Sequence, residues 1–203
     1  MSKLLVMCEC SQNVMSAFLR QGVDAYSCDL KPAMGAYPDR HLQMDCFDAF
    51  NMVEPAFVIA HPPCTYLTSA AAQYFDCPYR QEDIKAAREF FMRIYNLPVK
   101  FLVVENPTPM KALGLPPYSQ IVNPRDFGED FQKRTCLWIR GDLPPLMETV
   151  RTLDAVPMMD YKPMNYYKNG SRGEARSVFS KKVADAMAFQ WSPYCGKDLL
   201  DKF

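Results

Sequence analysis

Short, largely apolar runs bounded by turn residues divide the first half of the chain. They cover residues 3–7, 23–28, 41–44, 56–60 and 100–104. Such segments, each about as long as an ordinary strand, are typical of strands buried on both faces of a parallel sheet. We therefore predict a strand in each of these ranges.

Other segments carry apolar residues at the spacing of amphipathic helices. Residues 14–21 form one of them, residues 82–96 form the longest, and residues 177–191 form another late in the chain. Two further apolar runs, at 120–122 and 135–139, predict a pair of strands. Strands that alternate with helices indicate an α/β fold with a mostly parallel central sheet flanked by helices.

Composition adds few constraints to this picture. The 203 residues fit a single domain over 1–203, and 23 basic residues balance 23 acidic ones, so attraction to nucleic acid must be local. The eight cysteines have no Cys-x-x-Cys spacing and the chain has only two histidines, so we expect no metal site. We recognise neither a secretory signal nor a membrane segment and expect a cytoplasmic protein with reduced thiols. The sequence leaves the oligomeric state open.

Polar residues stand at the ends of the first three predicted strands. Residues 8–13 form the first strand-to-helix turn, which is where such folds hold a cofactor. Asp29 follows the second strand at the distance expected for a carboxylate that binds a ribose hydroxyl. Asp45 follows the third strand, where it could accept the amine of an adenine. No phosphate-binding glycine motif is present, which favours S-adenosylmethionine over a dinucleotide or ATP.

The ends of the fourth and fifth strands carry the candidate chemistry. Pro62 and Pro63 end the fourth strand and present Cys64 on a rigid turn. Glu105 directly follows the fifth strand, where a carboxylate is costly unless it is paired or used. A nucleophilic thiol and a carboxyl group at adjacent strand ends could flank one flat substrate.

This pair of motifs resembles the DNA cytosine-5 methyltransferases. Pro62-Pro63-Cys64 after one strand and Glu105-Asn106-Pro107 after the next occur here in that family's order, and Gln132-Lys133-Arg134 follows. The chain is most similar to the compact, phage-encoded methyltransferase-like proteins that lack a large target-recognition domain. The resemblance implies a class I (Rossmann-like) S-adenosylmethionine-dependent methyltransferase fold.

The resemblance also implies a role for each matching residue. At S-adenosylmethionine it places Glu9, Cys10, Ser11, Asp29, Leu30, Asp45, Cys46 and Pro62; at the substrate it places Pro63, Thr68 and Gln132; and in catalysis it places Cys64, Glu105, Asn106 and Arg134. The basic segment near the end of the chain adds Arg172 and Arg176 as candidate substrate residues.

The implied mechanism begins when the Cys64 thiolate adds to carbon 6 of the pyrimidine. Glu105 assists at ring N3, which requires its carboxyl pKa to be raised by its semi-buried position. Asn106 would brace the Cys64 loop and Arg134 would steady the base. The expected partner is DNA or a pyrimidine nucleotide.

The sequence departs from the family in two places. The first loop lacks the family's Phe-x-Gly-x-Gly pattern, since Cys10, Ser11 and Gln12 stand in its place. A small basic, tyrosine-rich insertion at about 150–176 stands in place of the target-recognition domain, and it overlaps a segment of positive charge at 162–182. That segment could grip a nucleic-acid backbone, although a solvated face explains it equally well.

Two other functions remain open at this point. The same fold could modify uracil or a modified pyrimidine, because a glutamate that faces N3 does not distinguish cytosine from uracil. Alternatively, the altered first loop could belong to a catalytically silent nucleotide-binding or phage accessory protein.

Overall fold

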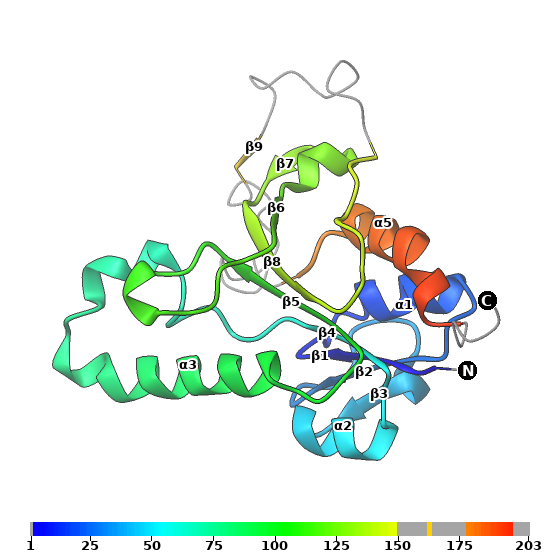
Figure 1. Cartoon of the computed structure of the whole chain (residues 1–203), viewed down its shortest axis with the longest axis horizontal. Helices are drawn as coiled ribbons and strands as arrows, with labels where there is room; N and C mark the ends of the chain where they lie inside the picture. Colours follow the sequence, from blue (N-terminus) through cyan, green and yellow to red (C-terminus); the bar gives the residue numbers. More distant parts are fainter. Residues whose placement is uncertain (1, 150–161, 164–177, 197–203) are drawn as a thin grey trace.

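Strand β1 (Leu4–Met7) lies inside a seven-stranded sheet. The computed structural model describes residues 2–149, 162–163 and 178–196 (Figure 1). β1 pairs in parallel with β2 (Ala25–Asp29) and with β4 (Phe57–Ala60). β3 (His41–Gln43) extends the sheet beyond β2, and β5 (Phe101–Pro107) extends it beyond β4, again in parallel.

Two further strands, β8 and β6, complete the sheet beyond β5, and only β8 runs in the opposite direction. β8 (Thr135–Arg140) runs antiparallel to both β5 and β6 (Gln120–Val122), so the strand order is β3-β2-β1-β4-β5-β8-β6. β7 (Phe131–Gln132) and β9 (Lys162–Pro163) form a separate small parallel pair. The sheet is thus parallel except for β8, which confirms the predicted Rossmann-like fold class.

Helices cover both faces of this sheet. α1 (Asn13–Arg20) and α5 (Lys181–Trp191) pack against one face, and α2 (Cys46–Val53) and α3 (Gln81–Tyr95) against the other (Figure 1). Short 3-10 helices lie in the connections: η1 (Pro38–Arg40), η2 (Ser69–Tyr74), η3 (Pro78–Arg80), η4 (Lys111–Leu113), η5 (Pro124–Phe127) and η8 (Ser192–Tyr194).

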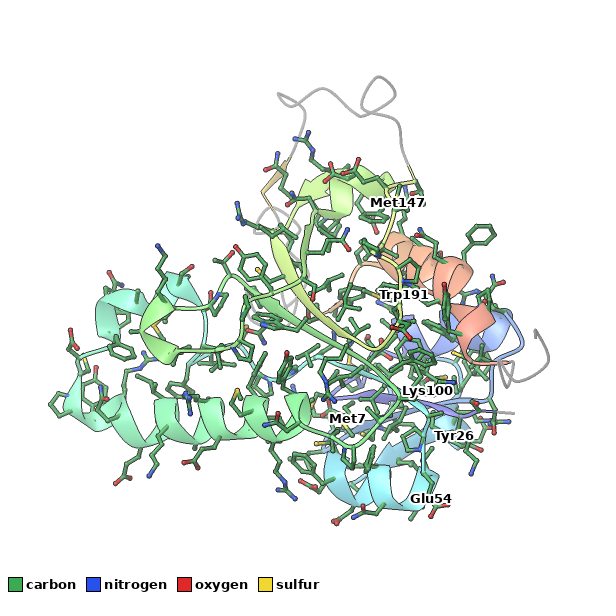
Figure 2. All side chains as sticks on the ribbon, viewed as in Figure 1. Met7, Tyr26, Glu54, Lys100, Met147 and Trp191 are labelled. Atoms are coloured by element: carbon green, nitrogen blue, oxygen red, sulfur yellow. The ribbon has the colours of Figure 1, made fainter. Side chains whose placement is uncertain are left out.

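The apolar runs are buried because alternate residues face opposite helix layers. In β1, Leu4 and Val6 belong to the core beneath α1 and α5, whereas Leu5 and Met7 belong to the core beneath α2 and α3. Figure 2 labels Met7, the last residue of β1, and Trp191, which is fully buried in the α5 layer. Since neither face of the central strands reaches water, an unbroken apolar run is the expected pattern.

Most predicted elements lie within a few residues of their expected bounds, with two differences. Helix α2 was not predicted, because Asp45 was interpreted as a ligand-binding residue rather than as a helix cap. β5 was expected to end before Glu105 but continues to Pro107, because Glu105 and Asn106 pair with Leu137 and Cys136 of β8. In the described residues, no helix is both long and apolar enough to cross a membrane.

The order of the strands determines where a ligand can bind. Because β1 has β2 on one side and β4 on the other, the loops that follow β1 and β4 leave the sheet at a topological switch point. Ligands of open α/β sheets bind in the crevice at such a point. The loop after β4 is the one that carries Cys64.

Candidate active site

The exit from β4 is held by backbone contacts with its neighbours. The His61 amide donates to the carbonyl of Met7 at 3.0 Å, which extends the pairing with β1 by one residue. The Asn106 side chain then donates from Nδ2 to the Pro62 carbonyl at 2.8 Å. Asn106 is 1% exposed, so this bond is shielded from water and joins the end of β4 to β5.

A tight turn follows at Cys64. Its carbonyl accepts hydrogen bonds from the amides of Leu67 and Thr68 at 3.0 and 3.1 Å. Leu67 is fully buried and anchors the far side of the turn, whereas the Cys64 side chain is half-buried and carries a free thiol. The turn therefore presents the thiol from a fixed backbone.

The loops after β4 and β5 are also joined to each other. The Ser69 amide donates to the Thr108 carbonyl, and the Met110 amide donates to the Leu67 carbonyl, both at 2.8 Å. These bonds hold the segment after Cys64 against the segment after Glu105. The two motifs are therefore brought together by backbone pairing, not by side chains alone.

Arg80 supports the outer side of the Cys64 turn. Its guanidinium stacks over the rings of Tyr66 and Tyr74 at 4.8 and 5.4 Å, and Nη2 donates to the Thr65 carbonyl at 3.5 Å. Stacking of this kind contributes about 0.5–1 kcal/mol at an exposed site. Arg80 thus connects the turn to the segment that leads into α3.

Glu105 forms a buried hydrogen bond with His61. His61 Nδ1 donates to Glu105 Oε2 at 3.2 Å, and the two side chains are only 10% and 8% exposed. Each is the first residue beyond the four paired positions of β4 and β5, so the parallel register places them side by side. The contact is thus a direct result of strand pairing.

The electrostatics of Glu105 differ from the expectation. Burial raises the pKa of its carboxyl group, but the hydrogen bond from His61 and the positive charge of Lys133 outweigh burial and leave the pKa below its ordinary value. The expected upward shift was therefore wrong. Desolvation acts as predicted, but the hydrogen bond from His61 and the charge of Lys133 were missing from the prediction.

Unsatisfied polar atoms concentrate at this site. Among the described residues, four buried side-chain atoms lack a hydrogen-bond partner: His61 Nε2, Glu105 Oε1, Asn106 Oδ1 and Arg80 Nε. Leaving such a group unpaired costs about 1–3 kcal/mol, so each is expected to have a use. Three of the four come from the ends of β4 and β5, which marks these strand ends as the place for a polar ligand.

His61 is enclosed from a distant part of the chain. The ring of Phe179, just before α5, lies 4.9 Å from the imidazole at a tilt of 45°. Phe179 is 6% exposed, and its carbonyl accepts a hydrogen bond from the Asn13 side chain at 2.8 Å. Phe179 therefore shields one face of the imidazole from water.

The loop after β1 has a second buried carboxylate, Glu9. Its two oxygens accept from the amides of Val14 and Met15 at 2.7 and 3.1 Å, in the first turn of α1. Burial raises the pKa of Glu9, although the charge of His61 and these two amides lower it in part. Glu9 thus occupies the anion-binding position at the start of α1.

This loop has a glycine-like backbone without glycine. Cys8 and Gln12 both have positive φ, at 59° and 60°. The Gln12 side chain donates from Nε2 to the Tyr37 carbonyl at 2.7 Å and to Ser27 Oγ at 3.3 Å. Its Oε1 accepts a hydrogen bond from the Tyr37 backbone amide at 3.0 Å. Gly35 packs directly on Gln12, where a Cβ would lie 2.5 Å from Gln12 Oε1. The segment after β2 therefore covers the first loop.

The two aspartates of the predicted cofactor edge make local hydrogen bonds. Asp29 Oδ1 accepts from the Lys31 amide at 2.9 Å, and Asp45 Oδ1 accepts from the amides of Phe47 and Asp48 at 2.8 and 3.4 Å. Asp45 is thus the N-cap of α2. Asp29 is the last residue of β2, as expected, whereas Asp45 lies two residues beyond the end of β3.

The other predicted cofactor residues differ in exposure. Leu30 is 74% exposed, Ser11 is half-buried and donates to Glu9 Oε1 at 3.4 Å, and Cys10 lies 3.6 Å from the sulfur of Met34. Cys46 is 5% exposed, and its pKa is lowered by a hydrogen bond with Cys8. Pro62 is buried at the end of β4.

Three of the predicted substrate residues lie in the described part of the chain. Pro63 and Gln132 are exposed, and Thr68 is half-buried and caps η2 through the Ala70 amide. Arg134, which was predicted to act in catalysis, is exposed. The positive charge of Arg134 acts on the Cys136 thiol, which places Arg134 near the β5–β8 pair. Arg172 and Arg176 lie outside the described residues, as do most of the predicted insertion at 150–176 and of the basic segment at 162–182.

The sequence reasoning missed two residues of this site, His61 and Phe179. His61 was detectable, because it stands at the same position after its strand as Glu105 does after the neighbouring strand. Phe179 had no comparable signal, since its contact depends on how the chain returns to the sheet. In the described residues no group of three or more histidine, cysteine, aspartate or glutamate side chains is arranged to hold a metal ion.

Comparison with known proteins finds similarity to solved structures only at the level of the fold. No protein family model matches the chain, and no curated protein matches its sequence. A crystal structure of a candidate DNA modification methyltransferase, encoded within an E. coli prophage, is similar over 68% of this chain, with 16% identity and a TM-score of 0.45. The similar region spans 46% of that protein, less than half of its length. The fold assignment rests on the strand order.

Proposed function

We propose that the chain transfers a methyl group to carbon 5 of cytosine, in DNA or in a nucleotide, through a covalent bond between Cys64 and carbon 6. One observation carries this proposal: buried, unpartnered hydrogen-bonding atoms surround the strand ends from which the Cys64 turn emerges. A site with a thiol and unsatisfied polar groups suits a flat polar ring that the thiol can attack.

Attack on a pyrimidine requires activation of the ring as well as of the thiol. A thiol with an ordinary pKa of about 8.5 is mostly protonated at neutral pH, and carbon 6 of neutral cytosine is a weak electrophile. A proton or a strong hydrogen bond at N3 withdraws electrons from the ring and makes carbon 6 more reactive. Glu105 is the carboxyl group beside the Cys64 turn, and its Oε1 has no partner among the described residues.

S-adenosylmethionine, when bound, supplies the electrophilic methyl group. The residues present suit its nucleoside end: Asp29 at the tip of β2 would hold the ribose hydroxyls, and the exposed Leu30 would lie against the adenine. Asp45 would reach the adenine amine only with an oxygen that is not engaged in capping α2. Cys8 and Gln12, with their positive φ, give the first loop the backbone shape that glycines provide elsewhere.

The test measures addition at carbon 6 without the cofactor. Reversible addition of Cys64 makes carbon 5 exchange its hydrogen with solvent, so an oligonucleotide carrying 5-deuterocytosine should lose deuterium in ordinary water, as seen by mass spectrometry. With S-adenosylmethionine present, 5-fluorocytosine should instead trap a covalent adduct on Cys64. Deuterium retention together with no adduct would contradict the proposal.

A second candidate, addition to uracil, is favoured by the pKa of Glu105. A carboxyl group with a lowered pKa is ionised at neutral pH and accepts a hydrogen bond, which matches the N3–H of uracil. Cytosine N3 is itself an acceptor and needs a donated proton. The same exchange measurement with 5-deuterouracil separates the two: faster loss from uracil than from cytosine would favour the second candidate.

A further inference from the structure

We infer that His61 supplies, through Glu105, the proton that cytosine N3 takes up when Cys64 adds to carbon 6. This inference rests on the proposed function and names the proton source for it. The pair would act as one acid, in which Glu105 touches the base and His61 is the positioning residue behind it.

The geometry favours a shared proton. His61 Nδ1 lies 3.2 Å from Glu105 Oε2, and the two side chains are 10% and 8% exposed, so water does not compete strongly for this bond. The second oxygen of Glu105, Oε1, accepts no hydrogen bond of normal length among the described residues, although the Thr135 side chain is close enough to help lower the Glu105 pKa. Oε1 therefore has room for a hydrogen bond to the substrate. One oxygen faces a proton source while the other remains for a ligand.

The charges around the pair explain why Glu105 alone cannot be this acid. Glu105 is held as a carboxylate by the hydrogen bond from His61 and by the charge of Lys133, which precedes β8. From the loop after β1, Glu9 also interacts electrostatically with His61. Phe179, on the segment before α5, adds an uncharged face. An ionised Glu105 has no proton of its own to donate, so the proton must come from its partner.

The step balances in electrons and protons. A sulfur electron pair of the Cys64 thiolate forms the bond to carbon 6, the π pair of C5=C6 shifts to C4=C5, and the π pair of C4=N3 moves to N3. Glu105 first takes the Nδ1 proton of the imidazolium on Oε2 and becomes a neutral carboxyl group. A turn of that group about its Cγ–Cδ bond presents the O–H to N3, which takes the proton as the C–S bond forms and leaves Glu105 a carboxylate again. The negative charge of the thiolate thus ends on the pair, which changes from imidazolium–carboxylate to neutral imidazole–carboxylate.

The experiment follows carbon-5 deuterium loss from cytosine against pH, without S-adenosylmethionine, in the wild type and in His61→Asn. Asparagine keeps an N–H donor for Glu105 but has no titrating proton. We divide the wild-type exchange rate by the fraction of Cys64 that is present as thiolate. We expect this corrected rate to fall as pH rises through the apparent pKa of the His61–Glu105 pair, which titrates as a unit. In His61→Asn the rate should drop roughly 10²–10⁴-fold, the range for a lost general acid, and the fall with pH should disappear.

Two further variants keep this result interpretable. His61→Gln, with melting temperatures for all variants, covers the possibility that His61→Asn does not fold. His41→Asn replaces the only other histidine of the chain and should leave the midpoint of the pH profile unchanged. A wild-type midpoint retained in a folded His61→Asn would overturn the inference while the proposed function stands. No exchange by the wild type at any pH would overturn both.

Discussion

The two halves of the strand-end edge use their polar side chains in opposite ways. On the side that we propose for the pyrimidine (the pyrimidine side: His61, Cys64, Glu105 and Asn106), three buried polar atoms have no hydrogen-bond partner among the described residues. On the side that we propose for the cofactor (the cofactor side: Glu9, Gln12, Asp29 and Asp45), each side chain forms a hydrogen bond within or between its own loops. Both sides stand at the ends of parallel strands, so position alone does not separate them.

The difference suggests a criterion: a buried polar residue that binds a ligand keeps an atom without a hydrogen-bond partner, whereas one that stabilises the fold has its atoms paired within the protein. Glu9 and Glu105 are both buried carboxylates, and the charge of His61 acts on both. Glu9 uses its two oxygens to cap α1, whereas Glu105 keeps one oxygen without a partner. The carboxylate that is incompletely satisfied is the better candidate for chemistry.

The largest effect should come from Cys64→Ser. We expect it to abolish both deuterium exchange and the 5-fluorocytosine adduct, because a serine hydroxyl is not ionised at neutral pH and adds to carbon 6 far more slowly. Cys77→Ser, which changes another half-buried cysteine, is the matched control and should retain both signals. An adduct mapped by peptide mass spectrometry to Cys8, Cys10 or Cys136 would rule out the Cys64 mechanism.

Replacing Glu105 and Glu9 in turn should show that only the carboxylate on the pyrimidine side takes part in adduct formation. Glu105→Gln should slow adduct formation by roughly 10²–10⁴-fold, because an amide cannot pass a proton to N3. Glu9→Gln, which changes the other carboxylate near His61, should slow it far less. Equal losses in the two variants would mean that Glu105 acts only through the charge around His61.

The cofactor side is tested by ligand-induced stabilisation. S-adenosylmethionine at a hundredfold excess over its Kd should stabilise the native protein by about 2.7 kcal/mol and raise the melting temperature. Asp29→Ala should remove most of that shift without lowering the melting temperature of the free protein. If the wild type shows no shift even at millimolar cofactor, and calorimetry agrees, the catalytically silent alternative replaces the methyltransferase.

Asn106 provides a test of stability on the pyrimidine side. Asn106→Ala removes the donor to the buried Pro62 carbonyl and should lower the free energy of unfolding by about 1–3 kcal/mol. Gln43→Ala removes a similar side-chain bond, to the carbonyl of Leu30, at an exposed position and should change stability little. Urea titration of both variants measures the free energy of unfolding. If both variants lose the same amount, the buried Asn106–Pro62 hydrogen bond contributes no more than the exposed one.

The smallest expected effect is a difference in pH dependence between the two carboxylates. The lowered pKa of Glu105 contributes stability above the unfolded pKa of about 4.3, which is lost as pH falls through the folded pKa. The raised pKa of Glu9 contributes stability below about pH 4.3, which is lost as pH rises through its folded pKa. Because glutamine mimics the neutral carboxyl group, both variants should depart from the wild type as pH rises above about 4.3, but with opposite signs. The wild type should gain stability relative to Glu105→Gln and lose stability relative to Glu9→Gln. Changes of the same sign would contradict the assigned pKa shifts.

Much of the fold could be predicted because burial on two faces leaves a direct mark on the sequence. The runs at 56–60 and 100–104 are apolar since their strands lie inside the sheet, and parallel pairing of adjacent strands then brings their ends together. The same reasoning placed Cys64 and Glu105 at neighbouring strand ends. Extended to one more position, it would also have paired His61 with Glu105.

The features that could not be predicted depend on contacts between separate loops. Glu9 caps α1 only because Cys8 and Gln12 have positive φ, and no glycine signals that backbone. The direction of the Glu105 pKa shift depends on Lys133, a residue far along the chain whose distance from the strand end no pattern reveals. Local patterns thus predict elements, whereas the ionisation of a site follows from the assembled structure.

The position of Phe179 has a consequence for the newly made protein. During synthesis the strands that carry Glu9, His61 and Glu105 emerge first, but the ring that covers His61 belongs to a segment made later. At about 5–20 residues per second, Phe179 follows Glu9 by roughly 10 to 30 s. Until Phe179 is made, that face of the His61 imidazole is not covered. The Cys64 thiol of a nascent chain can therefore be exposed before His61 has reached the water-shielded environment that it has in the finished protein.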